Sequence, residues 1–433
     1  MCTSDVTVYP LLLAVVESVW GRVHEASLFA VTDVVWAVLC CQSLHPADVA
    51  RALPGLQTTK ARQAMRRVRR LYQRRITRSD ALTPLLIRVV LLVVAPGPVT
   101  VVLDSTRCGP WEIFTVGACF SSGRVVPLAW SILPYPWPKR QFTPTVTALL
   151  TRTLAAWPAD RALHLVADRG FPSVELFLTL TRRVGTRCVG FTIRLRMGDY
   201  VTLVDGRSVA VGALVDATGV ASWRCLVASY VRSKTTGPAS QLVIGREEPL
   251  YPLHQRGPGD QARRASRAAQ RAAYLQRKGQ PNAIAHDGIW ALLTTETTAA
   301  AAVAQYRKRF STEGMYQDWM AWNLERIATR EPDPTCLDSM LGIAALTYVV
   351  QSVIGAAAGR TRIPELRARQ QQWTTTDRLS VAWRGRQVLH DYAFPWQPFV
   401  RTVLAGLRDT LDTRTLPPSC RQDACSHARQ EAA

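Results

Sequence analysis

The sequence predicts an α/β protein with a mixed β-sheet at its centre, a helical domain before the sheet and a β-rich insertion within it. Between residues 96 and 196, β-branched runs alternate with helix-forming segments, as is typical of such a sheet. Residues 1–95 indicate helices, and residues 197–286 interrupt the alternation. The chain has 433 residues, of which 48% are hydrophobic. That is enough to bury a large core in about two or three domains.

Residues 1–95 are predicted to form a helical DNA-binding domain. Within residues 45–78 a short helix, a Pro-Gly turn and a second helix follow one another, and apolar residues recur along the second helix at Met65, Val68, Tyr72 and Ile76. Such a helix-turn-helix with a basic second helix is a common DNA-binding module. We assign DNA contacts to Lys60, Arg66, Arg67, Arg70 and Arg74. The alternative is a solvated helix, although a dense face of one charge repels itself without a polyanion.

The central domain begins with residues 96–196. Its predicted strands lie at residues 99–104, 113–122, 124–133, 163–168 and 187–196, and its predicted helices at 143–156 and 172–183. Three consecutive strands followed by a helix, a strand, a helix and a strand predict a mixed sheet.

The insertion at residues 197–286 contains short strand-like runs and then a stretch rich in Arg, Ala and Gln. The core pattern resumes within residues 287–365, with a strand at 287–295 and a long helix at 299–328. Residues 366–433 are predicted to form a C-terminal helical region and a polar tail.

One uncharged segment, residues 340–359, has about the length needed to span a bilayer. It contains three glycines and the polar residues Thr347, Gln351 and Ser352. We therefore expect a helix buried in a large core, and no association of the chain with a membrane.

Charge and cysteine usage narrow the class of partner and the compartment. The formal net charge is +21, from 53 Lys and Arg against 32 Asp and Glu, which points to a polyanion such as nucleic acid. Nearly all the cations are arginine, which suits phosphate contact, although a GC-rich genome produces the same bias. The ten cysteines include no CxxC pair, so neither a zinc site nor a disulfide framework is indicated. A reducing cytoplasm fits this pattern.

Two predicted strands end in aspartate, at Asp104 and Asp168. If these strands are parallel neighbours, both carboxylates emerge at the carboxyl edge of the sheet, where ligands of α/β proteins gather. Close carboxylates repel each other, and a hard divalent cation such as Mg²⁺ or Mn²⁺ relieves that repulsion. The alternative for each aspartate is the start of a turn.

The long helix at 299–328 offers a third acid. Helical spacing places five residues on one face: Tyr306, Arg309, Glu313, Gln317 and Met320. If that face packs on the strand ends, Glu313 joins the aspartates, and Arg309 contacts a phosphate or orients Glu313. The alternative is an exposed Arg–Glu pair that contributes about 0.3–0.5 kcal/mol.

Four motifs, "VVLDST", "VADRGF", "DGIWALLTT" and "YRKRFSTEGMYQDWM", together resemble the DDE transposases of bacterial insertion sequences. The match is to the insertion-sequence-4 branch, which carries a Tyr-x2-Arg-x3-Glu-x6-Lys signature, and it covers roughly residues 30–355. Asp104 matches the first acid, Asp168 and the following Arg169 match the second, and Tyr306, Arg309 and Glu313 match the third motif. The chain departs from the signature at Met320, where the family has the lysine.

This resemblance implies a ribonuclease H-like core with the insertion between the second and third acids. It implies that Asp104, Asp168 and Glu313 hold two Mg²⁺ or Mn²⁺ ions, and that Arg309, Tyr306 and Arg169 contact DNA. The implied activity is cleavage of double-stranded DNA at terminal inverted repeats and strand transfer into target DNA. A dimer on DNA at the bacterial nucleoid is also implied.

Other functions also fit these features. A nuclease with the same core but no strand transfer is one alternative, and a decayed or domesticated DNA-binding copy, which Met320 favours, is another. Some relatives stack a flipped base on tryptophan, for which the candidates here are Trp223, Trp290, Trp319 and Trp322. A place in the core is the alternative for each of them.

Overall fold

The computed structural model describes residue 13 and residues 24–54, 61–94, 97–120, 125–181, 189–218, 223–232, 235–246, 288–331 and 333–360. Lys60, the basic segment of the insertion and the predicted C-terminal region 366–433 lie outside the described residues.

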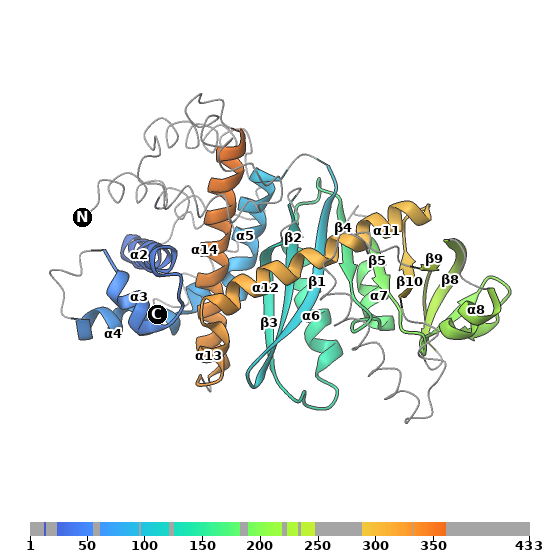
Figure 1. The fold of residues 1–433 in the computed structure, drawn as a ribbon, viewed down its shortest axis with the longest axis horizontal. Helices are drawn as coiled ribbons and strands as arrows, with labels where there is room; N and C mark the ends of the chain where they lie inside the picture. The colour runs from blue at the N-terminus through green and yellow to red at the C-terminus, as the bar shows by residue number, and fades with distance from the viewer. Residues whose placement is uncertain are drawn as a thin grey trace, which may run out of the picture.

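The described strands form one ten-stranded sheet, in the order β3-β2-β1-β4-β5-β10-β9-β8-β6-β7 (Figure 1). The core strands are β1 (Val99–Cys108), β2 (Trp111–Cys119), β3 (Val125–Pro134), β4 (Leu163–Ala167), β5 (Val189–Arg194) and β10 (Ile289–Thr294). β1 pairs parallel with β4, and β4 pairs parallel with β5, whereas β2 and β3 are antiparallel to their neighbours. The predicted α/β class, the mixed sheet and the parallel pairing of the first and fourth strands are therefore confirmed.

The prediction that a strand ends at Asp104 is wrong, because β1 continues to Cys108. The hairpin explains the extra length, since β1 stays paired with β2 until Cys108 faces Trp111. Pairing with β4 ends earlier, at Leu103 opposite Ala167. Asp104 is thus the first residue of β1 beyond the parallel pairing, and Asp168 directly follows β4.

The insertion extends the same sheet instead of forming a separate one. Its strands are β6 (Tyr200–Leu203), β7 (Ser208–Ala210), β8 (Arg224–Arg232) and β9 (Thr235–Arg246), and it also contains α8 (Val211–Thr218). β10 pairs antiparallel with β5 on one side and with β9 on the other. Because β10 offers both edges, the β-rich insertion continues the core sheet outward.

Helices cover both faces of the sheet (Figure 1). They are α5 (Ser79–Val93), α6 (Phe142–Ala156), α7 (Val174–Thr181), α11 (Ala299–Arg307), α12 (Ser311–Ala321), α13 (Leu324–Ala328) and α14 (Pro334–Arg360). On β2, the Thr115 side chain hydrogen-bonds Tyr316 of α12, whereas the ring of the adjacent Phe114 packs on Phe142 of α6. Neighbouring strand residues point to opposite faces, so α12 and α6 lie on opposite sides of the sheet.

The N-terminal residues are helical, as predicted, in α2 (Glu25–Cys41), α3 (Pro46–Ala52) and α4 (Ala61–Tyr72). In α4, Val68 and Tyr72 are buried and Met65 is half-buried, which confirms three members of the predicted apolar stripe, whereas Ile76 lies beyond α4 and is half-buried. The helix is shorter than predicted, because a separate 3₁₀ turn, η2 (Arg75–Thr77), follows it.

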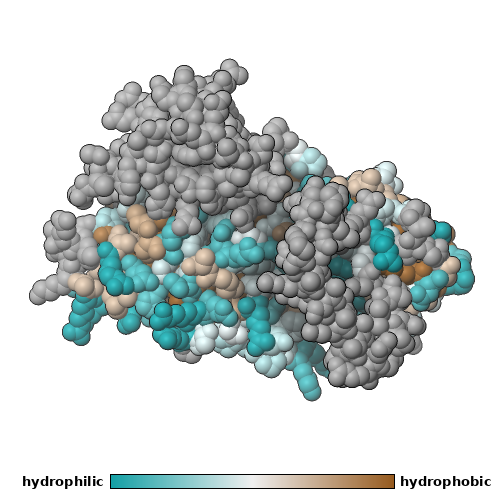
Figure 2. All heavy atoms as spheres, in the orientation of Figure 1, coloured by the Kyte–Doolittle hydropathy of each residue, from teal (hydrophilic) through white to brown (hydrophobic). Residues whose placement is uncertain are grey.

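The arginines assigned to DNA in this region differ in their partners. Arg66, Arg67, Arg70 and Arg74 are all exposed, and Figure 2 shows hydrophilic side chains along the lower edge of this part of the molecule. Arg67 pairs with Asp33 of α2 at 2.9 Å, and Arg74 donates to the Ser27 hydroxyl at 3.0 Å. These two side chains thus also tie α4 and the residues after it to α2, and DNA contact by this domain stays a prediction.

The apolar segment at 340–359 forms most of α14, and its side chains are buried wherever the structure describes them, at residues 340–352, 354 and 355, as predicted. α14 packs against α5, α2 and β3, and its Asp338 accepts hydrogen bonds from the Ser79 backbone N–H and the Trp130 indole. Among the described residues no single helix has the length and composition to cross a membrane, and only the bent pair α2–α3 meets that test when taken together.

A glycine in α14 permits its close approach to η2. A Cβ atom at Gly342 would lie 1.6 Å from the Thr77 carbonyl oxygen, a backbone atom that cannot move aside alone. Although alanine favours helix, we expect Gly342→Ala to lower the free energy of unfolding by about 3 kcal/mol because the site is overpacked. Denaturant unfolding measures this, with Gly198→Ala as control, since nothing lies within 4 Å of a Cβ there. Equal stability of the two variants would contradict the packing.

Candidate active site

The two aspartates meet at the carboxyl edge of β1 and β4, next to a buried arginine. Arg309 Nη2 lies 3.4 Å from Asp168 Oδ2 and 3.8 Å from Asp104 Oδ2. The side chains of Arg309 and Asp104 are 15% and 10% exposed, so little water screens the three charges. The sequence prediction that both aspartates share one edge with Arg309 is therefore confirmed.

Arg309 balances the two carboxylates mainly through its charge. Burial alone would lower the pKa of Arg309, but Asp104, Asp168, Tyr306 and Glu313 together raise it. Both ion-pair distances exceed a normal hydrogen bond, and the buried Arg309 Nε has no hydrogen-bond partner among the described residues. The guanidinium is thus close to both acids without being tightly hydrogen-bonded to either.

Each aspartate also has its own hydroxyl partner. The Tyr306 hydroxyl donates to Asp168 Oδ1 at 2.8 Å, and the Thr312 hydroxyl donates to Asp104 Oδ2 at 2.6 Å. The Thr312 oxygen also lies 2.8 Å from the Arg309 carbonyl oxygen. These contacts orient the carboxylates and link them to the helix that carries Arg309.

The surroundings shift the pKa values of the two aspartates in opposite directions. Burial raises the pKa of Asp104, and Arg309 and Thr312 only partly offset it. Burial also tends to raise the pKa of Asp168, but Arg309, the Arg169 backbone N–H and Tyr306 together lower it. Asp168 therefore holds its negative charge more readily than Asp104, a difference often seen in pairs of catalytic carboxylates.

Glu313 does not join the aspartates in this structure. Its side chain is exposed, whereas Thr312 is buried against Asp104. Among the described residues, no three His, Cys, Asp or Glu side chains are grouped closely enough to hold a metal ion. Glu313 still acts on the site through its charge, which helps to raise the pKa of Arg309.

A change of helix type explains why Thr312, and not the predicted Glu313, faces Asp104. The predicted single helix at 299–328 is interrupted by a 3₁₀ turn, η4 (Lys308–Phe310), and again after α12 ends at Ala321. A 3₁₀ helix has about 3.0 residues per turn instead of 3.6, so three such residues advance the face by about 60°. The residue that follows Arg309 on the sheet side is then Thr312 at i+3, not Glu313 at i+4.

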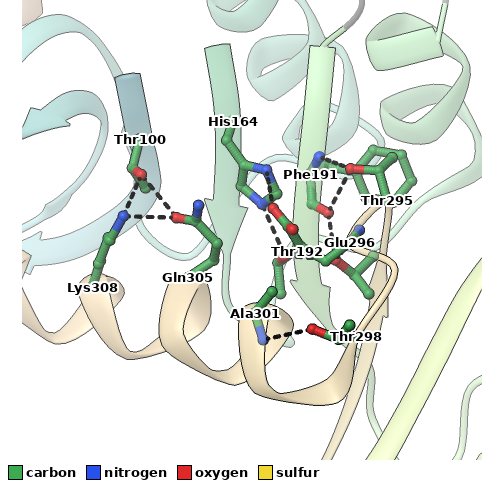
Figure 3. A network of polar contacts seen from close by, with 11 residues as sticks. Thr100, His164, Phe191, Thr192, Thr295, Glu296, Thr298, Ala301, Gln305 and Lys308 are labelled. Carbon is green, nitrogen blue, oxygen red and sulfur yellow. Dashed lines mark hydrogen bonds and ion pairs between the residues drawn. The ribbon is translucent and has the colours of Figure 1, made fainter. Parts of the chain in front are cut away.

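A polar network holds α11 and η4 on the sheet (Figure 3). The Thr100 hydroxyl of β1 donates to Gln305 Oε1 at 2.8 Å and accepts from Lys308 Nζ at 2.9 Å. Gln305 directly precedes Tyr306 in the chain, and Lys308 directly precedes Arg309. The network therefore sets the position at which Tyr306 and Arg309 reach the acids.

The same layer contains a buried histidine on β4. His164 Nε2 lies 2.9 Å from the Thr192 hydroxyl, and His164 Nδ1 lies 3.2 Å from Glu296 Oε1. A Cβ atom at Gly190 would lie 2.7 Å from His164 Nδ1, so the imidazole requires glycine on the neighbouring strand. Burial and the charge of Lys308 lower the pKa of His164 to about 4, and they outweigh the partly exposed Glu296 carboxylate.

The other residues singled out in the sequence lie outside the contacts around Arg309. Arg169 is exposed, and its carbonyl oxygen accepts from Arg196 Nε at 2.7 Å. Met320, which replaces the expected lysine, is half-buried and packs on the core. Of the proposed stacking tryptophans, Trp223 is half-buried, and the following have at most 3% exposure and belong to the core: Trp290, Trp319 and Trp322. The Trp290 ring supports Tyr306, with ring centroids 4.8 Å apart.

Comparisons with known proteins identify no family for the chain. No protein-family model matches it, and no curated protein matches its sequence. Its structure is similar to a solved chain described as piggyBac transposase synaptic complex with hairpin DNA, at 10% identity and a TM-score of 0.36 over 95% of this chain and 77% of that chain. Similarity at this level carries no conclusion about function, so the resemblance to the insertion-sequence-4 branch stays a prediction.

Removal of the buried cation tests the ion pairs. We expect Arg309→Met to lower the free energy of unfolding by about 3 kcal/mol at neutral pH, because two carboxylates then lose their counter-charge. Arg309 lowers the pKa of Asp168, so this stability is present above the ordinary value of 3.8 and is lost as the pH falls through the lower folded value. Denaturant titrations at several pH values measure it.

Two controls accompany this variant. Arg326→Met removes an exposed arginine and is expected to change stability by less than about 0.5 kcal/mol. In a double-mutant cycle, Asp104→Asn is expected to recover part of the loss in Arg309→Met. Strictly additive effects would show that the two side chains do not interact.

The buried imidazole predicts a pH-dependent stability. The pKa of His164 is about 4 when folded against an ordinary 6.5, so the unfolded chain binds more protons between these values. Stability should therefore fall as the pH drops from about 6.5 to 4, by up to about 3 kcal/mol. His164→Gln should flatten this part of the curve in denaturant titrations. A curve that keeps its slope in the variant would assign the pH dependence to other groups.

Proposed function

We propose that the chain is a DDE-type transposase that cleaves double-stranded DNA by phosphoryl transfer. The observation that carries this proposal is the convergence of Asp104 and Asp168 on one buried guanidinium at the carboxyl edge of two parallel strands. Phosphoryl transfer requires such a concentration of positioned charge more than it requires covalent chemistry. The net charge of +21 supports DNA as the substrate.

The donor atoms of the two aspartates suit a hard divalent cation. Both offer carboxylate oxygens, and Mg²⁺ is commonly held by one or two carboxylates together with waters and substrate phosphates. Asp104 and Asp168 would hold Mg²⁺ or Mn²⁺, which activates the attacking oxygen and stabilises the leaving oxygen when bound. Two carboxylates are therefore enough to hold such an ion, and a third is not required.

The protein's own side chains prepare this site. Arg309 offsets the repulsion between Asp104 and Asp168, and its planar fork suits a phosphate as readily as a carboxylate. Tyr306 and Thr312 each hold one carboxylate oxygen, and the other oxygen of Asp104 accepts the Ser105 backbone N–H at 2.9 Å. Each carboxylate has about four acceptor sites, so further sites remain for a ligand. Arg309 can thus exchange a carboxylate partner for a DNA phosphate without leaving the site.

We retain Glu313 as the third acid of the DNA-bound state. It is one helical turn from Arg309, and relaxation of η4 to α-helical geometry would turn it by about 60° toward the sheet. Arg309 and Glu313 then act on the same phosphate-binding edge. The dimer on DNA, the terminal inverted repeats as substrate and the bacterial nucleoid as location belong to the same proposal.

Cleavage of the DNA that flanks this reading frame tests the acids. With Mg²⁺ and a plasmid carrying that DNA, we expect Asp104→Asn and Asp168→Asn to reduce cutting to background, because each removes a negative ligand. Glu313→Gln should do the same if Glu313 turns inward. Asp160→Asn and Glu325→Gln, which alter exposed carboxylates, serve as matched controls and should cut like wild type.

The pattern of loss separates the candidate functions. If both aspartate variants cut like wild type, the site assignment is wrong, and if only Glu313→Gln does, the site has two acids. A supplied pre-cut end with a free 3′-hydroxyl is joined to target DNA by a transposase but not by a simple nuclease. Salt-sensitive binding with no cutting by any variant or wild type would indicate a DNA-binding protein without catalysis.

A further inference from the structure

A cleft opens at the edge of the sheet that carries the acids, where the core sheet meets the insertion, and Phe142 of α6 among its lining residues places it on the side of the sheet opposite α12. Its volume is about 650 Å³, within the usual range of about 300–1,000 Å³ for ligand pockets. Arg169 and Gly170, which directly follow Asp168, line the cleft together with Arg196 after β5. Because β4 and β5 are parallel, their carboxyl ends bring the cleft and the acids to the same edge of the sheet.

Two exposed aromatic side chains line this cleft, one from the core and one from the insertion. Trp137 follows β3 and is 42% exposed, and Tyr200 begins β6 and is 53% exposed. The Trp137 ring rests on Phe142, with centroids 4.7 Å apart, and Phe142 in turn packs on Phe114 of β2. An indole supported from below and open above is a preformed stacking surface.

Three arginines bring positive charge to the cleft. Arg169, Arg196 and Arg232 are exposed and line it, with Asp199 as the single acid among the lining residues, a difference of three minus one, or +2. None of the three guanidinium groups forms an ion pair with a carboxylate in the part of the chain that the structure describes. Asp199 instead accepts from the Arg196 backbone N–H at 2.7 Å. Arg196 Nε donates to the Arg169 carbonyl oxygen, and Arg196 and Arg232 act on Asp199 through their charge. The excess of two positive charges still attracts an anionic ligand to the cleft.

We propose that this cleft binds unpaired nucleotides of a DNA strand that passes the edge of the sheet carrying the acid pair. Exposed rings suit base faces and an excess of arginine suits phosphates, and the two together characterise sites for single-stranded nucleic acid. A duplex hides its base faces in stacked pairs and is far larger than the cleft. The inference rests on the proposed function for its ligand class, since it assumes that DNA reaches the acids.

Binding to DNA probes without metal tests the cleft, because no cutting can occur. The full chain is titrated with a blunt duplex and with the same duplex carrying a short single-stranded tail, and fluorescence anisotropy gives the affinity. We expect Trp137→Ala to lose about tenfold in affinity for the tailed duplex and less than about twofold for the blunt one. Trp137→Phe, which keeps a ring, should retain most of the affinity, and circular dichroism checks that each variant is folded.

A second variant examines the charges. Arg232→Ala should reduce the slope of log affinity against log salt by about 0.7 for the single-stranded tail, the value for one lost phosphate contact. Arg224, at the other end of β8, is also exposed but does not line the cleft. Arg224→Ala is the matched control, and its slope should equal that of wild type.

The outcomes distinguish this inference from the function on which it rests. Equal losses on blunt and tailed duplexes, or no loss in Trp137→Ala, would overturn the cleft proposal while leaving DNA cleavage intact. Absence of any DNA binding by wild type would overturn both. Tighter binding of the tailed duplex that depends on Trp137, in a chain that cuts no DNA, would support the cleft and reject the catalytic proposal.

Discussion

The contact of Arg309 with Asp104 and Asp168 is the interaction on which the arrangement of this edge depends. Parallel pairing of β1 and β4 in register brings the two carboxylates to adjacent positions, where they repel each other. A guanidinium with little exposure offsets that repulsion. Every element around it contributes to placing it: β1 and β4 carry the acids, η4 carries the arginine, and the Thr100–Gln305–Lys308 network holds η4 over the sheet. Strand register and helix position thus set the distances at which Arg309 offsets the charges of Asp104 and Asp168.

The continuous sheet connects the strands that carry the acids to the insertion. Since β10 pairs with both β5 and β9, the insertion is joined to the core by backbone hydrogen bonds along two strands. The cleft between Trp137 and Tyr200 is therefore bounded by parts of one sheet and its loops. Arg169 lines the cleft and directly follows Asp168 in the chain, so the cleft and the acids share one loop.

Several features followed from the sequence alone, and others did not. Strands, helices and the edge shared by Asp104 and Asp168 were predicted, since β-branched runs and helical spacing act over a few residues. The extension of β1 past Asp104 depends on its hairpin partner β2. The exposure of Glu313 depends on one 3₁₀ turn, which no residue type in that segment predicts. Thr312 was missed for the same reason. Trp137 was missed because thirteen tryptophans are alike in sequence, and only packing separates the exposed ring from the buried ones.

The sequence by itself determined the class of the fold, the succession of strands and helices along the core and the places of two aspartates near strand ends, because alternation and residue type are local properties. It also determined a strongly basic chain, which predicts an anionic partner. Only the tertiary structure decided which side chains surround those aspartates. The reason is the extra rotation of about 60° that η4 adds to the helix, relative to a continuous α-helix. This rotation turns Thr312 toward Asp104 and leaves Glu313 in solvent. Whether a cation pairs with a carboxylate or faces a cleft likewise depends on distances between segments far apart in the chain.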